Sequence, residues 1–244
     1  MRVLGFGKSA PNVNGAFVAS SASVIGNVLI GANSSVWYGA VVRGDVNSVK
    51  IGENVTVGDR AMLHCSGGGD RDAPLVVGSN VTIKAGAIVH GCTIADGCVI
   101  GEGAQIMDGA SMGKNAMVGP GSIVAENKIV PPGQLWAGVP AKYQRDISPE
   151  EMAAFAEAVQ ENAEMALLHS SEDAKAWDQI EDDLYNHEQD VGRSEYYFQR
   201  LSDEAMQFKI GEVEGHNVPG RVLDSEVSAR EHKEPRPDGT GGMA

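Results

Sequence analysis

Residues 63–92 read LHCSGGGDRDAPLVVGSNVTIKAGAIVHGC, and this stretch holds both the periodicity that decides the fold and two histidines, His64 and His90. On either side of the insertion SGGGDRDAP, aliphatic residues return at every sixth position, as at Ile83 and Val89. Glycines and asparagines between them suit corners that need a positive φ. The stretch therefore predicts short strands of equal length that are joined by tight corners.

The six-residue period extends through the first half of the chain. Seventeen positions of the repeat are aliphatic or Met, and the residue four further on is usually small or β-branched. The seventeen positions are Val18, Val24, Ile30, Val36, Val42, Ile51, Val57, Leu63, Val77, Ile83, Val89, Ile94, Ile100, Ile106, Met112, Val118 and Val124. An antiparallel β protein alternates with a period of two, so the period of six predicts a three-sided parallel β-helix in which about 18 residues form one coil.

Grouping the repeats by threes predicts which residues stack on adjacent coils. The column that follows the aliphatic one contains Arg43, His64, His90 and Met107, and the column on the neighbouring edge contains Tyr38, Asp59, Ala85 and Glu102. Adjacent coils are about 4.8 Å apart, so we expect His64 and His90 to lie side by side on one outer edge.

Two uses of this histidine pair stay open from the spacing alone. Two imidazoles on adjacent coils can share one metal ion, since zinc takes nitrogen ligands at about 2.0–2.1 Å. A histidine on a repeat edge can instead form a hydrogen bond across a contact between subunits. Arg43 and Asp45 are expected one coil below the pair, with Asp59 nearby. These charged neighbours strengthen the metal-site hypothesis without deciding between the two uses.

The composition is that of an ordered protein in a reducing compartment. With 244 residues, of which 42% are apolar, the chain can bury a sizeable core. Three cysteines are too few for a disulfide framework, and we expect Cys65 and Cys92 to be buried thiols rather than metal ligands. The chain has no run of about 18 apolar residues, and its start, MRVLGFGKSAPNV, lacks the core of a signal peptide. Any import signal is therefore expected to have been removed or to lie elsewhere.

The net charge of −14 is unevenly distributed along the chain. Residues 1–130 hold nine basic and nine acidic residues, so the remaining ten basic and 24 acidic residues carry the whole excess. An acidic surface repels nucleic acid, and we therefore expect no nucleic-acid partner. The excess indicates either a solvated surface or a docking patch for a basic partner.

The chain changes character after residue 130. The predicted division is a β-helix over 1–130, a connecting segment over 131–147, a C-terminal helical segment over 148–210, and an acidic extended or disordered tail over 211–244. Within the helical part, apolar spacing predicts a second segment over 174–184 and a short helix over 193–210. No period survives in the tail, where Gly, Pro and charged residues dominate.

The first helix of this part has a well-defined start. Ser148 is suited to cap it, Pro149 to its first position, and Glu151 to a capping box. The apolar stripe that follows consists of Met152, Phe155, Val159, Ala163, Ala166 and Leu167. This spacing predicts a helix from about residue 149 to about residue 169 that lies along one side of the β-helix.

The run SSVWYGAVVRGDVNSVKIGENV, the pair Asp59 and His64, the run VTIKAGAIVHGCTI and the exit PPGQLWAGVPAKYQRDIS closely resemble the γ-class carbonic anhydrases, over residues 11–147. The resemblance implies a trimer of left-handed parallel β-helices, a hexapeptide-repeat solenoid, with zinc at each subunit interface. In that family two histidine ligands come from one chain, at the positions of His64 and His90. The third comes from the neighbouring chain, at the position of Ala85.

The sequence departs from the family pattern at two positions of this site. Ala85 offers no lone pair to a metal, and Gly58 stands where the family has a glutamine beside the zinc-bound water. Arg43 and Asp45 match the family's ion pair between subunits, and Asp59 matches its site-lining carboxylate. The resemblance therefore implies a preserved scaffold with damaged chemistry, in which zinc is expected at one interface only.

The segment ENAEMALLHSSEDAKAW, residues 161–177, is similar to the helix that follows the solenoid in the γ-carbonic-anhydrase-like subunits of mitochondrial respiratory complex I, the NADH:ubiquinone oxidoreductase. In plants and many protists those subunits form a trimer on the matrix side of the membrane arm, and some paralogues lack zinc ligands. The resemblance implies an accessory subunit at the mitochondrial inner membrane, peripheral and not spanning. Its partners are expected to be two paralogous γ-carbonic-anhydrase subunits and membrane-arm subunits. The alternative location is the cytoplasm of a bacterium.

The sequence and its family resemblance leave three functions of different classes open. The first is a structural, catalytically inactive subunit of a heterotrimer. The second is a zinc-dependent carbonic anhydrase that hydrates carbon dioxide as a trimer, although two protein ligands fall below the usual three of a catalytic zinc. The third is an acyltransferase that uses an edge histidine as its base, but no residue pattern indicates a groove for an acyl carrier. Ala85 argues against the enzyme.

Overall fold

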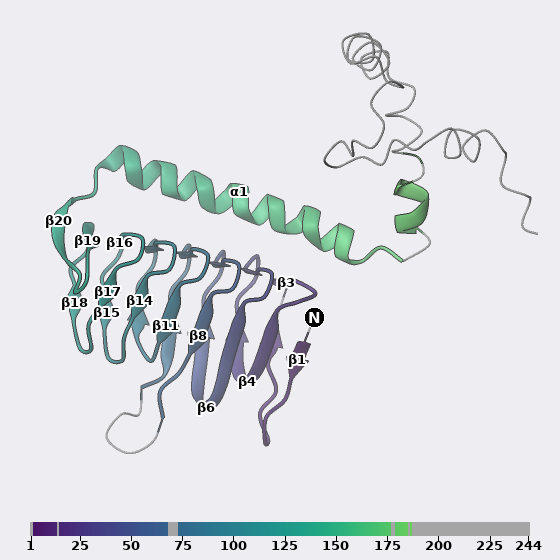
Figure 1. Cartoon of the computed structure of the whole chain (residues 1–244), viewed down its shortest axis with the longest axis horizontal. Coiled ribbons are helices and arrows are strands. Elements are labelled where there is room, and N and C mark those ends of the chain that lie inside the picture. The colour runs from purple at the N-terminus through teal and green to yellow at the C-terminus, as the bar shows by residue number, and fades with distance from the viewer. Residues whose placement is uncertain (1, 14, 68–72, 177–178, 185, 187–244) are drawn as a thin grey trace, which may run out of the picture. The chain divides into compact units, whose positions relative to one another are not determined.

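The computed structural model describes residues 2–13, 15–67, 73–176, 179–184 and 186. Its main body is a parallel β-helix, and the helix α1 runs along one side of it (Figure 1). The predicted fold class, a parallel β-helix followed by an α-helix, is therefore confirmed.

The first side of the β-helix is a sheet with one strand from each coil. Seven strands are parallel and stack in chain order, and an eighth, antiparallel strand closes the end. Along the stack they are β3 (Phe17–Val18), β5 (Ser35–Val36), β7 (Thr56–Val57), β10 (Thr82–Ile83), β13 (Val99–Ile100), β16 (Met117–Val118), β19 (Gln134–Ala137) and β20 (Lys142–Asp146). The described chain thus forms seven coils, and β19 continues the stack after residue 130.

The second and third sides belong to one larger sheet, because the long strand β6 (Val41–Ile51) takes part in both. Its first residues pair with β8 and its last residues pair with β9. The second side contains β4 (Ser23–Ile30), β8 (Met62–His64), β11 (Ile88–His90), β14 (Gln105–Ile106) and β17 (Ile123–Val124), and the third contains β9 (Leu75–Val77), β12 (Thr93–Ile94), β15 (Ser111–Met112) and β18 (Ile129–Val130). At the N-terminal end, β1 (Arg2–Leu4) and β2 (Asn12–Val13) pair with β4.

The register between coils is the one that the repeat predicts. Leu63 pairs with Val42 on one neighbouring coil and with Val89 on the other. All seventeen aliphatic positions are buried, and none is more than 8% exposed. Asparagines occupy several corners with positive φ, and Asn54, with φ of 54°, donates a side-chain hydrogen bond to Asn80 on the next coil at 3.2 Å. The period of six therefore predicts both the core and the stacking of the coils correctly.

The helix α1 (Pro149–Asp173) begins as the sequence predicts. The Ser148 side chain accepts a hydrogen bond from the Glu151 backbone, and the Glu151 side chain accepts one from the Ser148 backbone, so the capping box is complete. Val159 is buried, whereas Leu167 is 72% exposed. The assignment of Leu167 to the buried stripe is therefore wrong, because one residue advances about 100° around a helix and Ala166 already takes the inward position.

A cluster of rings holds the C-terminal half of α1 against the first coils. His169 Nδ1 lies 2.9 Å from Tyr38 Oη, and the centroid of its ring lies 4.9 Å from that of Trp37 in an edge-to-face arrangement. Four residues further on, Asp173 accepts a hydrogen bond from the backbone N–H of Ser20 at 3.0 Å. These contacts fix the helix along the first side of the β-helix, where the sequence predicts it.

A second unit begins at residue 176, and of it the structure describes residues 176, 179–184 and 186. Within it, residues 179–184 are helical, inside the second segment that the sequence predicts. The predicted helix over 193–210 and the predicted acidic tail over 211–244 lie outside the described residues. Among the helices that are described, none has both the length and the apolar character to cross a membrane.

Candidate metal site on the histidine edge

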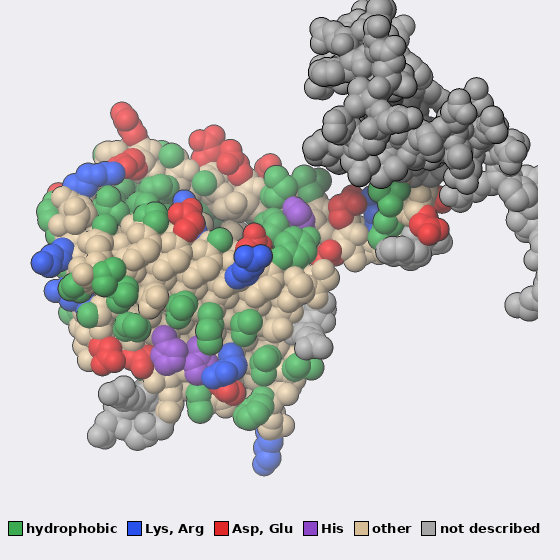
Figure 2. Space-filling view, viewed as in Figure 1, with side chains coloured by type: hydrophobic (Ala, Val, Ile, Leu, Met, Phe, Trp, Pro, Cys, Tyr) green, Lys and Arg blue, Asp and Glu red, His purple; other side chains and the backbone are tan. Residues whose placement is uncertain are grey.

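The two predicted histidines lie on adjacent coils at the same register position. His64 ends β8 and pairs with His90, which ends β11. Because side chains alternate along a strand, the burial of Leu63 and Val89 directs the following histidines outward. The ring centroids are 4.8 Å apart, and His64 Nδ1 lies 2.9 Å from His90 Nε2. In Figure 2, where histidine side chains are purple, two of them lie next to each other low on this face of the β-helix.

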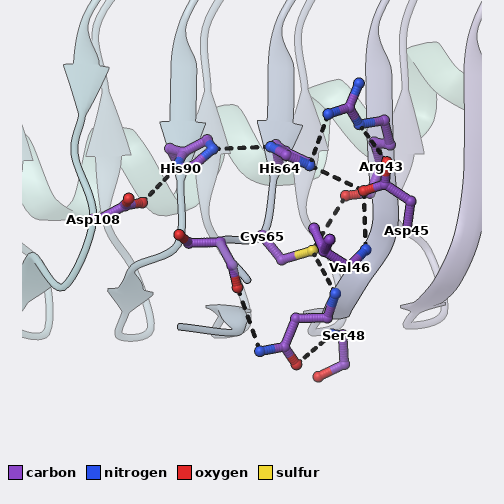
Figure 3. A network of polar contacts seen from close by, with 10 residues as sticks. Arg43, Asp45, Val46, Ser48, His64, Cys65, His90 and Asp108 are labelled. Carbon is purple, nitrogen blue, oxygen red and sulfur yellow. Dashed lines mark hydrogen bonds and ion pairs between the residues drawn. The ribbon is translucent and has the colours of Figure 1, made fainter. Parts of the chain in front are cut away.

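A continuous chain of polar contacts passes through the two rings (Figure 3). At one end, His64 Nε2 lies 3.0 Å from Arg43 Nη2 and 3.0 Å from Asp45 Oδ1. At the other end, His90 Nδ1 contacts the carboxylate of Asp108 on the next coil. The predicted group of Arg43, Asp45, His64 and His90 is thus brought together within one chain, and Asp108 joins it.

The donors and acceptors of this network place the proton of a neutral His90 and allow two tautomers of a neutral His64. Asp108 can only accept, so His90 Nδ1 carries a proton and His90 Nε2 carries a lone pair. With its proton on Nδ1, His64 donates to His90 Nε2 and keeps a lone pair on Nε2. That lone pair accepts from Arg43 Nη2, because a guanidinium has only donors. In the alternative tautomer, His64 Nε2–H donates to Asp45 instead.

Asp45 and Arg43 form an ion pair beside His64. Arg43 Nε lies 3.1 Å from Asp45 Oδ2, although its N–H is not aligned with any acceptor. Burial alone would raise the pKa of Asp45, but hydrogen bonds from His64 and the backbone, together with the charge of Arg43, hold that pKa below its usual value. Asp45 is therefore ionised at neutral pH, and its charge is balanced by Arg43.

A second group of possible ligands, Asp45, His64 and Cys65, lies close together, with its ligand atoms within 4.8 Å of one another. Arg43 contacts both Asp45 and His64, so a cation there would lie beside a permanent positive charge. The Cys65 thiol accepts from the backbone N–H of Asn47 at 3.2 Å and points at the Arg43 carbonyl. The histidine pair is therefore the better cation site.

The cysteines are buried thiols, as the sequence predicts. Cys65, Cys92 and Cys98 are free and almost completely inaccessible. Burial raises the pKa of the Cys98 thiol to about 11, and it raises that of Cys92 further. Since thiolates rather than thiols bind metals, this burial disfavours Cys92 and Cys98 as ligands.

The second predicted edge is also correct in register. The carbonyl groups of Tyr38, Asp59, Ala85 and Glu102 each accept a hydrogen bond from the corner of the next coil. Asp59 lies on this edge, where its carboxylate accepts from the backbone N–H of Tyr38 at 3.0 Å. The structure therefore does not place Asp59 beside His64 and His90 within one chain, because the two edges bound opposite ends of the second side.

Ala85 and Gly58 lie against each other on this second edge. Ala85 is exposed, so its short side chain faces away from the core of its own chain. A Cβ atom added at Gly58 would lie 2.8 Å from Ala85 N and 2.9 Å from Ile83 O. The absence of a side chain at Gly58 thus allows the backbone of the next coil to approach closely, at the position where the third ligand would stand.

The histidine pair fits part of a zinc site. Tetrahedral zinc with ligands at about 2.0–2.1 Å separates its ligand nitrogens by roughly 3.3 Å. His64 Nδ1 and His90 Nε2 are 2.9 Å apart, so a small ring rotation would let both nitrogens reach one ion once no proton lies between them. Within the described chain no further histidine lies at this edge, and the alanine at position 85 cannot supply one to a neighbouring copy.

Sequence reasoning missed two features of this region. Asp108 is two residues past Ile106 and one coil above His90, so its position in the repeat was a usable signal. The contact between Tyr38 and His169 joins residues that are far apart in the sequence, and no spacing rule indicates it. Both features depend on where side chains point rather than on the period.

Comparison with known proteins places these observations in a family. No family model matches the chain. It is 49% identical over 174 residues to "Gamma carbonic anhydrase 3, mitochondrial" of Arabidopsis thaliana, a match that covers 70% of this chain and 67% of that relative. It is 40% identical over 167 residues to "Gamma carbonic anhydrase 2, mitochondrial" of the same plant, which covers 68% of this chain and 60% of the relative. The chain thus spans somewhat less than two thirds of some of the mitochondrial relatives.

The fold also matches a solved bacterial structure. A hexapeptide transferase family protein from Anaplasma phagocytophilum superposes with a TM-score of 0.64 at 34% sequence identity, covering 68% of this chain and 96% of that one. The match spans nearly the whole bacterial chain, so it supports the description of residues up to the end of the β-helix as a repeat solenoid.

Proposed function

The chain belongs to the γ-carbonic anhydrase family, and from that premise we propose that it is a structural, catalytically inactive subunit of a trimer. The observation that carries this proposal is Ala85, which stands on an exposed edge at the place where a third metal ligand is needed. Gly58 adds to it, because the glutamine expected beside a metal-bound water is also missing. The histidine edge of the same chain retains its two possible ligands.

The second side of the β-helix supports assembly as a trimer. The Ala85 edge lies at its start and the edge of His64 and His90 lies at its end, since β11 runs from one to the other. Between the edges, Met62 and Ile88 expose 38% and 37% of their surface. A cyclic trimer around this side would cover these apolar side chains and bring the histidine edge of each chain against the Ala85 edge of its neighbour.

Zinc is the metal that the histidine pair suits, since imidazole nitrogens are among its usual ligands. His64 and His90 would hold it, and a neighbouring chain would have to supply a third ligand. When bound with an open position, zinc lowers the pKa of a water molecule to about 7. Arg43 and Asp45 hold the outer nitrogen of His64, and thereby keep that ring turned toward His90. In a homotrimer of this chain every interface lacks the third ligand.

A role in a heterotrimer of mitochondrial complex I follows from the relatives and from one segment. Both plant relatives carry mitochondrial names. The segment of residues 161–177, most of which lies in α1, resembles the helix that follows the solenoid in complex I subunits of this family. The proposed partners are therefore two paralogous γ-carbonic-anhydrase subunits and membrane-arm subunits, on the matrix side of the inner membrane.

Hydration of carbon dioxide is the second candidate function, and the intact histidine edge is the observation that favours it. It would operate only where a partner chain brings a histidine to face His64 and His90. Acyl transfer is the weaker alternative, although the bacterial structure carries a transferase name. The outer nitrogens of both histidines are occupied by charged partners, which disfavours either ring as a general base.

Native mass spectrometry with metal analysis of the purified full chain tests this proposal. We expect a homotrimer without stoichiometric zinc, and an Ala85→His variant that gains close to one zinc ion per interface. The matched control is Glu102→His, which adds a histidine to the same edge one coil away.

Two results would contradict the proposal. A wild-type homotrimer that holds three zinc ions and hydrates carbon dioxide would disprove the inactive role. An Ala85→His variant with an unchanged zinc-to-protein ratio would show that the two edges do not meet.

A further inference from the structure

The carboxylate of Asp108 lies beside His90, one of the two proposed metal ligands, and Asp108 is not among the residues that match the family's site. It lies one coil above His90 and accepts a hydrogen bond from His90 Nδ1 (Figure 3). Its side chain is 21% exposed, compared with 33% for His90. Asp108 is therefore half-buried behind the ring, on the side that faces away from His64.

The local backbone is arranged so that this carboxylate can reach the ring. Gly91, which follows His90, has a φ of 38°, and a Cβ atom there would lie 2.6 Å from Asp108 Oδ1. Any side chain at position 91 would displace the carboxylate. The His-Gly sequence on one coil and the Asp-Gly sequence on the next thus form one unit that places Asp108 against His90.

We propose that Asp108 is a positioning residue that fixes the tautomer and the orientation of His90, so that the edge offers His90 Nε2 and His64 Nδ1 to a cation. This inference rests on the metal site in the proposed function. Metal-binding histidines almost always donate their other ring N–H to a carboxylate or carbonyl group, and that contact sets the ring orientation. Without Asp108, the proton of a neutral His90 is free to move to Nε2, where it blocks the metal.

His64 completes the proton balance. When a cation takes the lone pair of His90 Nε2, the proton on His64 Nδ1 has to leave that nitrogen. His64 Nε2 can carry the proton instead and form a hydrogen bond to Asp45, whose Oδ1 lies 3.0 Å away. Arg43 remains paired with Asp45. Both rings would stay neutral, and the edge would take a divalent ion through a change of tautomer on His64.

Two measurements on the full-length chain test the role of Asp108. The first is zinc affinity by competition with a chelator in the Ala85→His background, where we expect Asp108→Ala to weaken binding by about 10- to 100-fold. Asp108→Asn retains an acceptor oxygen, so it should recover part of this loss. The second is the tautomer of His90 in otherwise wild-type protein without zinc, from ¹⁵N spectra of histidine-labelled chain. We expect a proton on Nδ1, and its loss from that atom in Asp108→Ala.

Asp96→Ala is the matched control. Asp96 precedes Gly97 as Asp108 precedes Gly109, both glycines have positive φ, and both aspartate carbonyl groups accept from an asparagine on the next coil. Its carboxylate contacts Ser79 and Lys114 rather than a histidine, so zinc affinity and the His90 tautomer should not change.

The outcomes separate this inference from the proposed function. If Ala85→His fails to bind zinc while His90 carries its proton on Nδ1 only when Asp108 is present, the trimer site is wrong and the role of Asp108 stands. If Ala85→His binds zinc, and Asp108→Ala alters neither zinc affinity nor the tautomer, the positioning role is overturned. If the alanine variant does not fold, Asp108→Val, which has a similar volume and no acceptor, gives the same decision.

Discussion

Gly58→Ala tests whether the second edge has room for a side chain at position 58. The new Cβ would lie 2.8 Å from Ala85 N, 2.9 Å from Ile83 O and 2.9 Å from Lys84 C. All three are backbone atoms of the next coil, and none can rotate away as a flexible side chain can. The backbone of residues 83–85 therefore has to shift by several tenths of an ångström.

The energetic cost follows from this crowding. Overpacking of a well-packed region costs about 1–3 kcal/mol. Loss of backbone freedom in the unfolded chain on replacing glycine returns about 0.4–1 kcal/mol. The net destabilisation is about 1–2 kcal/mol, which lowers the thermal midpoint of a domain of this size by about 2–8 °C. A glutamine at position 58 would add its longer side chain to the same clash.

Thermal unfolding followed by circular dichroism measures this effect. The matched control is Gly119→Ala, at the same repeat position after a buried valine, where the nearest atom is the Ala137 side chain at 3.0 Å. We expect a clearly smaller shift there, because the nearest backbone atom, Trp136 O, lies at an ordinary contact distance of 3.7 Å. A Gly58→Ala variant with an unchanged or raised midpoint would refute the close approach of the two coils.

Two further predictions concern the helix α1. His169→Phe should weaken the docking of α1 by about 1 kcal/mol, because the hydrogen bond to Tyr38 is lost. His169→Ala should also lose the ring contact with Trp37, which is worth about 0.5–1.5 kcal/mol. Hydrogen exchange of the α1 amides measures both effects, and equal exchange in all variants would refute the contact. Glu151, bonded by both terminal nitrogens of Arg145 at 2.6 Å, has its pKa lowered to about 2 from an ordinary value of 4.5, because Arg145 and the Ser148 backbone stabilise its charge. Because the pKa of Glu151 is lower in the folded than in the unfolded chain, its ionised carboxylate stabilises the folded state above pH 4.5, and this contribution is lost as the pH falls toward 2. Helicity measured by circular dichroism should therefore decrease in that window in the wild type and should not do so in Glu151→Gln.

The period of six predicts the stacking of the coils because one inward aliphatic residue per side leaves a single register that buries all of them. The adjacency of His64 and His90 follows from the same register, and so does the common edge of Asp59 and Ala85. The period says nothing about which ring nitrogen faces which neighbour. That depends on side-chain rotation and on contacts such as the one from Asp108.

Other features were beyond the sequence for related physical reasons. At Gly58 the two coils lie a few tenths of an ångström closer together than a Cβ atom at that position would allow. No residue pattern encodes so small a difference in spacing. The exposure of Leu167 depends on how α1 is rotated about its axis, which the contact of His169 with Tyr38 helps to set. Placement of Asp59 away from the histidines within one chain depends on the width of the second side.

The two edges make this subunit directional in any ring that it joins. Its histidine edge can complete a site when the next chain carries a histidine at the position of Ala85, whereas its own Ala85 edge leaves the site of the preceding chain one ligand short. In a heterotrimer with two partners that keep every ligand, one of the two interfaces that this subunit forms is then complete and the other is vacant. A homotrimer of this chain has none. Zinc stoichiometry therefore reports the composition of the ring as well as the state of its sites, and it links the single residue Ala85 to the choice between a structural and a catalytic assembly.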